Sequence, residues 1–136
     1  MPLRGLLDTS TVILLGRITD PSVLPDEPVI SAITLAELSV GPLVTDDPDE
    51  RAARQAHLQL AESDFDPLPF DAAAARAFGS IAADLRRAGR KPTARAYDAL
   101  IAATAISRQL PVFTCNTGDF SGIAGLDLRA IPHPDH

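Results

Sequence analysis

LRGLLDTS, residues 3–10, is a short apolar run that ends at an acid and is followed directly by two hydroxyl residues. The run over residues 3–8 predicts a buried strand that ends at Asp8. Thr9 and Ser10 offer side-chain oxygens that cap helix amides, so we expect a helix over about residues 10–17. A strand that passes directly into a helix is the repeating unit of α/β proteins.

The same unit recurs along the chain. Further apolar strands are expected at residues 29–32, 65–70, 110–115 and 126–131. The intervening helices are expected at residues 34–41, 48–62, 71–89 and 93–109, with Asp47, Asp71 and Thr93 as caps of the last three. The pattern predicts an α/β fold, a three-layer α/β/α sandwich with a mostly parallel sheet of about five strands.

Length and composition indicate one globular domain. The 136 residues suffice for a compact core, and we expect a single domain over residues 1–132 with a frayed tail at 133–136. The lone Cys115 cannot form an internal disulfide, which fits a reducing, cytoplasmic setting. The N-terminus lacks the apolar core of a signal peptide, and no run approaches the ~18 apolar residues of a membrane helix. We therefore expect a cytoplasmic protein with no membrane partner.

The charge is unevenly distributed. A net charge of −6 makes the whole chain a poor partner for nucleic acid. Eleven of the twelve basic residues are arginine. Five basic residues nevertheless lie within ten positions, and these are Arg86, Arg87, Arg90, Lys91 and Arg95. They could steer phosphate groups, or they could simply solvate the end of a helix, where positive charge is favourable.

Three acids lie where expected strands end, and a fourth lies inside an expected helix. Asp8, Glu37 and Asp119 each follow a strand closely, and the carboxyl ends of parallel strands share one edge of the sheet, where sites of α/β proteins form. Asp98 lies inside an expected helix, on the face of apolar residues three, four and seven positions further on. A lone carboxylate buried there costs several kcal/mol, on the order of 5, unless it is paired or binds a metal.

Each acid also has a purely structural interpretation. Asp8 could cap a helix, and Asp119 could be a turn residue. Glu37 could complete a capping box with Thr34. Asp98 could be neutralised by the arginine three residues before it, or by an arginine from elsewhere in the chain. Together, these interpretations require four unrelated coincidences at one sheet edge, so a shared cation is the simpler explanation. Oxygen ligands without a combination of His and Cys suit Mg²⁺ or Mn²⁺ rather than zinc.

Four motifs resemble one family in order and spacing. LLDTS, TLAEL, YDALIAATA and TCNTGDFSGI together resemble the PIN-domain ribonucleases, specifically the VapC toxins of toxin–antitoxin modules. The resemblance covers nearly the whole chain, and GLDLRAIP resembles the family's last strand. It implies a Mg²⁺-dependent or Mn²⁺-dependent endoribonuclease that hydrolyses RNA phosphodiester bonds with a metal-activated water.

By this resemblance, several residues match the family's catalytic positions. The acidic cluster corresponds to Asp8, Glu37, Asp98 and Asp119, and the supporting polar positions correspond to Thr9, Ser10 and Asn116. We expect Asp8 and Asp98 to hold the main ion, with Glu37 and Asp119 acting through waters or on a second ion. Tyr97 and Cys115 depart from the residues expected at their positions, which bears on substrate choice more than on catalysis.

The resemblance also implies partners. The substrate is RNA, and a small antitoxin blocks the acidic groove, often with a basic side chain that pairs with the carboxylates. Relatives usually form homodimers, so a homodimer is expected here. The helical segment at residues 48–62, with apolar Leu58 and Leu60, is a candidate contact surface.

Three other classes remain to be weighed. A receiver domain needs a lysine near a late strand, whereas the only lysine, Lys91, lies between expected helices. A phosphatase of the haloacid-dehalogenase type needs a second acid two residues after Asp8, where Ser10 stands. An inert PIN-like interaction module would be expected to have lost an acid, and none of the four is lost.

Overall fold

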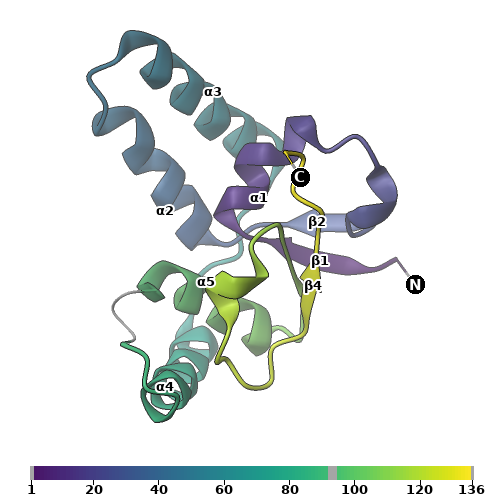
Figure 1. Ribbon diagram of the computed structural model, residues 1–136, viewed down its shortest axis with the longest axis vertical. Coiled ribbons are helices and arrows are strands. Elements are labelled where there is room, and N and C mark those ends of the chain that lie inside the picture. Colours follow the sequence, from purple (N-terminus) through teal and green to yellow (C-terminus); the bar gives the residue numbers. More distant parts are fainter. Residues whose placement is uncertain (1, 92–94, 136) are drawn as a thin grey trace.

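The computed structural model describes residues 2–91 and 95–135, in which helices cover both faces of a parallel sheet (Figure 1). Within these residues the sheet has four strands in the order β2-β1-β3-β4, and every pair is parallel. The strands are β1 (Arg4–Leu7), β2 (Glu27–Val29), β3 (Val112–Thr114) and β4 (Leu128–Ala130). The expected α/β sandwich is confirmed.

The helices form two groups around the sheet. The α-helices are α1 (Thr9–Leu14), α2 (Ala32–Val40), α3 (Pro48–Asp64), α4 (Ala72–Arg87) and α5 (Ala96–Ser107). Short 3₁₀ helices are η1 (Leu15–Arg17), η2 (Pro21–Val23), η3 (Gly41–Leu43) and η5 (Thr117–Phe120). Figure 1 shows α2 and α3 as a hairpin that extends away from the sheet, with α4 and α5 packed together below it.

Alternate residues of the central strands fill two separate cores. Leu6 packs with residues of α4 and α5 such as Ile101, whereas Leu7 packs on the other face with residues of α1 and α2 such as Leu38. Both leucines are fully buried. Because the central strands are covered on both faces, their sequence is a continuous apolar run rather than an alternating one.

Most helix starts follow the expected caps. The Asp47 and Asp71 carboxylates accept hydrogen bonds from backbone N–H groups in the first turns of α3 and α4, as predicted. The first helix begins one residue earlier than expected, because Asp8 rather than Thr9 or Ser10 is its cap. The cap predicted at Thr93 lies outside the described residues.

The start of α2 differs from the expected capping box. The helix begins at Ala32, and the Ser31 hydroxyl accepts a hydrogen bond from the Thr34 N–H at 3.2 Å. Thr34 therefore lies in the first turn and is not the cap. The capping-box interpretation of Thr34 and Glu37 is wrong, and the Glu37 carboxylate is left available for another role.

The strand expected at residues 65–70 reduces to one bridge. Leu68 pairs with Ser31 in an isolated parallel bridge, and its N–H donates to the Ile30 carbonyl at 2.9 Å. Pro67 and Pro69 flank it and have no N–H to donate, which prevents a longer ladder. The sheet thus has four strands and a single bridge in place of the fifth strand.

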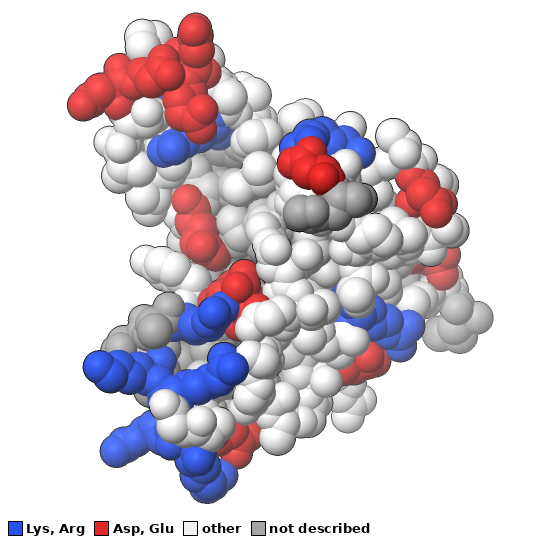
Figure 2. Space-filling model, viewed as in Figure 1, with Lys and Arg blue, Asp and Glu red and all other residues white. Residues whose placement is uncertain are grey.

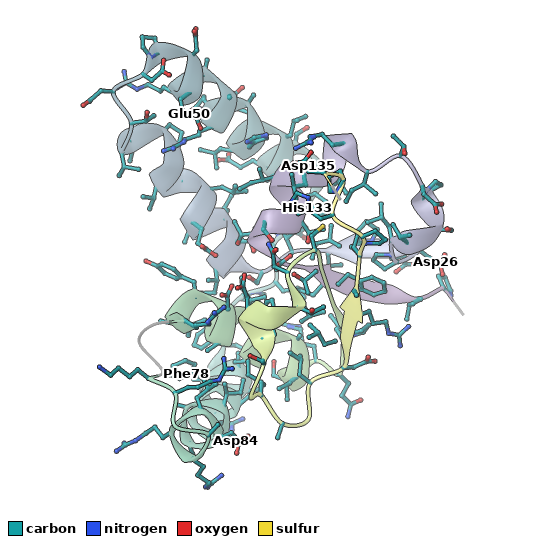
Figure 3. The ribbon with its side chains drawn as sticks, in the orientation of Figure 1. Asp26, Glu50, Phe78, Asp84, His133 and Asp135 are labelled. Atoms are coloured by element: carbon teal, nitrogen blue, oxygen red, sulfur yellow. The ribbon has the colours of Figure 1, made fainter. Side chains whose placement is uncertain are left out.

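The C-terminal tail lies against η1 and the segment that follows it. The Arg17 guanidinium donates to the Asp135 carboxylate, and Figure 3 shows His133 and Asp135 near α1. His136 lies outside the described residues. No helix in the described part of the chain is long and apolar enough to cross a membrane.

Candidate active site

The four predicted acids come together from four separate segments. Asp8 follows β1, Glu37 lies in α2, Asp98 lies in the first turn of α5, and Asp119 lies in η5. The pKa of Asp98 is raised to about 6, first by burial and then by the negative charges of the other three acids. The Asp98 carboxyl group is therefore close enough to the other three acids for their charges to raise its pKa. Figure 2 shows acidic side chains in the hollow between the α2–α3 hairpin and the α4–α5 region.

Asp8 is buried among hydroxyl groups. Its Oδ1 accepts from the Thr11 hydroxyl at 2.5 Å and from the Thr11 N–H at 3.3 Å. Its Oδ2 accepts from the hydroxyls of Ser10 at 3.0 Å and Thr114 at 2.8 Å. Asp8 is thus both a helix cap and a fixed carboxylate at the sheet edge. These roles do not exclude each other.

Thr11 and Thr114 are site residues that the sequence analysis missed. Besides its bond to Asp8, the Thr11 Oγ1 accepts from the Cys115 N–H at 3.2 Å. The Thr114 Oγ1 likewise accepts from the Asn116 N–H at 2.9 Å. The hydroxyls tie the end of β3 to the start of α1. The only available signal was their position beside Asp8 and beside Asn116 in the sequence.

The supporting polar residues predicted from the sequence lie around the acids. The Asn116 amide donates to the Ser10 hydroxyl at 3.2 Å. The Thr9 hydroxyl donates to Glu37 Oε1 at 2.7 Å and lies 3.0 Å from the Thr34 hydroxyl. The Glu37 carboxylate is therefore directed toward the start of α1 and not toward its own helix start.

Burial also affects Glu37. Desolvation is the largest cause that raises its pKa, the hydrogen bond from Thr9 opposes the rise, and the charge of Asp8 adds to it. Both Glu37 and Asp98 thus hold their negative charge at a cost in the metal-free protein. A cation placed among the acids would remove that cost.

Arg95 pairs with Asp119 and not with Asp98. Its Nη1 lies 2.5 Å from Asp119 Oδ1, and both side chains are partly exposed. The interpretation in which Arg95 neutralises Asp98 is therefore wrong, although its charge lowers the Asp98 pKa slightly against the stronger opposing causes. Among residues 2–91 and 95–135, the Asp98 carboxylate has no hydrogen-bond or ion-pair partner.

The carboxylate oxygens of the four acids are of the type that binds a hard divalent cation, although they lie too far apart to surround one. In the described residues, no three His, Cys, Asp or Glu side chains converge closely enough to hold an ion. Three of the acids face other groups, since Asp119 faces Arg95, whereas Asp8 and Glu37 accept hydrogen bonds from hydroxyls. The four acids offer carboxylate oxygens, and Asp98 has no hydrogen-bond or ion-pair partner within the described part of the chain. These properties fit Mg²⁺ or Mn²⁺ better than zinc.

The predicted basic group divides in two. Arg90, Lys91 and Arg95 line a pocket that reaches Asp119. Arg86 and Arg87 lie on the exposed last turn of α4, where Arg87 pairs with Asp84 at 2.8 Å. Figure 2 shows Lys and Arg side chains gathered over this region, below the acidic hollow.

Comparison with known proteins agrees with the observed fold. The PIN domain family matches residues 6–126. Ribonuclease VapC5 of Mycobacterium tuberculosis is 40% identical over 126 residues, which cover 91% of this chain and 90% of that protein. Ribonuclease VapC of Rickettsia bellii is 32% identical and covers 96% and 98%. A crystal structure of VapBC-5, a member of the VapBC family of toxin–antitoxin systems from M. tuberculosis, superposes with a TM-score of 0.79 at 38% identity and covers 96% and 98%.

Proposed function

The chain belongs to the PIN-domain family, and we propose that it is an endoribonuclease, the toxin of a toxin–antitoxin module. The observation that carries the proposal is the Asp98 carboxyl group, which lies close enough to three other acids for each to raise its pKa. Asp8 caps α1 and Asp119 pairs with Arg95, but neither role requires Glu37 and Asp98 to lie near them. The meeting of the four acids at the carboxyl edge of a parallel sheet is expected of a catalytic site.

We assign metal binding to the acids. Asp8 and Asp98 would hold the main Mg²⁺ or Mn²⁺ ion, with Glu37 and Asp119 contributing through waters or to a second ion. When bound, the ion supplies an activated water and neutralises charge on the phosphate. The protein's own residues prepare this arrangement, because Thr11 and Thr114 fix Asp8 and Thr9 fixes Glu37. No histidine base is required.

Asp8→Asn and Asp98→Asn test the assignment. Each variant should lose at least about 100-fold in RNA cleavage, as removal of one catalytic electrostatic group commonly does. Asp66→Asn is the matched control, because Asp66 is exposed and lies outside the cluster. Cleavage of structured RNA is measured with Mg²⁺, Mn²⁺ or EDTA. Activity that survives in EDTA, or is retained in full by either variant, would refute the metal assignment.

We propose a small antitoxin as the protein partner, because the VapBC-5 relative is a toxin–antitoxin system. A basic side chain of such a partner can pair with the acids in place of the metal. The ion pair between Arg95 and Asp119 is a contact of this kind within the chain and supports the proposal. Displacement of bound Mn²⁺ by the antitoxin's C-terminal peptide would support this arrangement.

A homodimer is proposed on the α3 surface. Leu60 is 59% exposed and lines a groove of about 520 Å³ with Ile13 of α1. Leu58, by contrast, packs against the core and contributes little to this surface. Leu60→Glu should shift sedimentation from dimer to monomer, while Val44→Glu, at another exposed apolar residue, should not. An unchanged dimer in Leu60→Glu would place the contact elsewhere.

A further inference from the structure

A pocket of about 230 Å³ adjoins the acidic cluster at Asp119. Its floor is apolar and is formed by Leu85, Ala99 and Ile123. Its rim is cationic and is formed by Arg90, Lys91 and Arg95. The only acid that lines it, among the described residues, is Asp119, whose carboxylate is already paired with Arg95.

The backbone holds Arg90 over this pocket. The chain leaves α4 through Gly89, at φ +75°, with hydrogen bonds from the Arg90 N–H to the Leu85 carbonyl at 2.8 Å and from the Gly89 N–H to the Arg86 carbonyl at 3.0 Å. This pair of bonds is the Schellman motif, and it directs the next residues away from the helix axis. Arg90 is thus turned toward the loop after η5.

The Arg90 side chain packs against Gly122 on that loop. A Cβ atom at Gly122 would lie 3.4 Å from Arg90 Cδ and 3.4 Å from Leu85 Cδ2. The glycine also has φ +87°, a conformation that other residues rarely adopt. Arg90 therefore lies across the gap between the end of α4 and the η5 loop. The contact between Arg90 and Gly122 positions one side of the pocket, and the ion pair between Arg95 and Asp119 positions the other.

The size and charge of the pocket limit its ligand. Its volume is below the ~300 Å³ at which sites for drug-sized molecules begin, so it has room for about one ring system. The apolar floor suits an uncharged planar body, whereas three cations favour an attached anion. A basic peptide side chain would be repelled here, although the acids nearby would attract it.

We propose that this pocket binds one unpaired nucleotide of the RNA substrate, next to the bond that is cut. The base lies on Leu85, Ala99 and Ile123, and its phosphate contacts Arg90 and Lys91. This inference rests on the proposed ribonuclease function and deepens it. Proteins read RNA sequence mainly through bases that are unstacked and splayed out. The enzyme should therefore show a base preference at one position beside the cut.

Binding of nucleotides to the metal-free protein tests the pocket separately from catalysis. Uridine and adenosine 5′-monophosphate are titrated in EDTA and followed by NMR chemical shifts, with the nucleosides and inorganic phosphate as comparison probes. At least one monophosphate should bind more tightly than both its nucleoside and phosphate, with shifts at Ala99 and Ile123. Equal binding of inorganic phosphate would reduce the pocket to an anion site and overturn the proposal. Tighter binding of tetraglutamate than of either monophosphate would also overturn the proposal, because the pocket would then prefer an acidic peptide to a nucleotide.

Arg90→Met keeps much of the packing on Gly122 and removes the charge. It should weaken monophosphate binding about tenfold, as loss of one charged hydrogen bond does. Arg76→Met is the matched control, because Arg76 is an exposed arginine on the same helix and does not line the pocket. An equal loss in both variants would indicate general electrostatics and overturn the proposal.

Mapping of cleavage sites supplies the second measurement. Ile123→Ala should reduce the base preference beside the cut while Mn²⁺ affinity stays within about twofold, since the acids are untouched. A preference that is unchanged in Ile123→Ala would refute the base contact. If the protein binds monophosphates but cleaves no RNA, the proposed function fails and the pocket stands. If it cleaves RNA but binds no monophosphate, the pocket assignment fails alone.

Discussion

At the residue scale, Asp98 carries a partly buried negative charge that has no hydrogen-bond or ion-pair partner within the described residues. Its apolar neighbours on the same helix face, Ile101, Ala102 and Ala105, are fully buried, so the carboxylate lies at the end of a core-directed face. Burial and three neighbouring acids disfavour its charge, and it has no partner within the described residues. The charge of Asp98 therefore lowers the stability of the metal-free protein, and a bound cation would restore it. Such unfavourable charges are typical of functional sites.

The metal-free protein should gain stability when Asp98 is neutralised. The pKa of Asp98 is about 6 in the folded state against 3.8 for an ordinary aspartate. Its contribution to stability is therefore present below pH 3.8 and is lost as the pH rises through about 6. In EDTA at neutral pH, Asp98→Asn should raise the Tm by about 3 °C, corresponding to about 1 kcal/mol after solvent screening.

The pH dependence makes this result specific. The difference in Tm between Asp98→Asn and the unmodified protein should shrink as the pH falls from about 6 toward 3.8. Added Mg²⁺ should stabilise the unmodified protein and not the variant, because a ligand stabilises only the state that binds it. A variant that is less stable than the unmodified protein at neutral pH in EDTA would contradict the explanation.

Thr114 should act as a positioning residue for Asp8. Its hydroxyl donates to Asp8 and accepts from the Asn116 N–H, so Thr114→Val loses both bonds with little change in shape. Mn²⁺ affinity and cleavage should fall about 10- to 100-fold, the usual effect of removing a residue that orients a metal ligand. Thr114→Ser should restore both.

Thr104→Val is the matched control for Thr114→Val. Thr104 is equally buried, but its hydroxyl donates to the Leu100 carbonyl within its own helix. Its loss should leave Mn²⁺ affinity unchanged in titrations followed by electron paramagnetic resonance. An equal fall in affinity in both variants would assign the effect to general destabilisation.

The sequence predicts the acids but not the groups that orient them. Asp8, Glu37 and Asp119 could be placed at one edge, because strand ends in a parallel sheet share an edge. Asp98 could be added because it lies on the apolar, core-directed face of its helix. The contact between Thr114 and Asp8 spans 106 positions, and that between Arg95 and Asp119 spans 24. Such contacts depend on the angle at which elements meet, which local patterns do not contain.

At the scale of elements, the Phe113 side chain of β3 lies against the backbone of β1 at Gly5. A Cβ atom there would lie 2.5 Å from Cε1 of the buried Phe113 ring and 2.8 Å from Pro25 Cβ. Neither group can move easily, because one is a packed ring and the other belongs to a fixed pyrrolidine. The glycine thus allows β1 to sit against the side chain of its neighbouring strand.

Gly5→Ala should therefore destabilise the protein by about 1–3 kcal/mol, the usual cost of overpacking a core. Gly16→Ala is the control, since a Cβ atom at Gly16 meets nothing within 4 Å. Urea unfolding of both variants measures the difference. A Gly5→Ala variant as stable as Gly16→Ala would show that Phe113 can repack.

Elements with strong local signals could be predicted, and those that depend on partners could not. The caps Asp47 and Asp71 act through neighbouring amides, so local sequence suffices. Residues 65–70 have an apolar pattern, yet a strand needs donors along its length, and Pro67 and Pro69 remove two. The helix after β2 begins at Ala32, directly after Ser31, which both caps the helix and forms the bridge to Leu68.

At the scale of the whole molecule, charge is separated rather than balanced. The chain carries a net charge of −6, yet the end of α4 and the start of α5 present basic residues beside the acidic hollow. RNA phosphates would be repelled by the molecule as a whole and attracted to this one region. Because the two effects act over different distances, they respond differently to salt and to single charge reversals.

Arg86→Glu and Arg76→Glu separate these two effects. Both change the net charge by the same amount on the same helix, but only Arg86 lies at the end of α4 that carries the basic residues. If the basic residues at the end of α4 contact RNA phosphates, Arg86→Glu should lower the slope of log affinity against log salt by about 0.7. This is the value for one lost contact to a single strand. Arg76→Glu should leave that slope unchanged. Filter binding of a catalytically inactive Asp8→Asn protein to single-stranded RNA gives both slopes. Equal slopes would mean that Arg86 only solvates the helix end, and RNA would then be guided by the pocket and the metal alone.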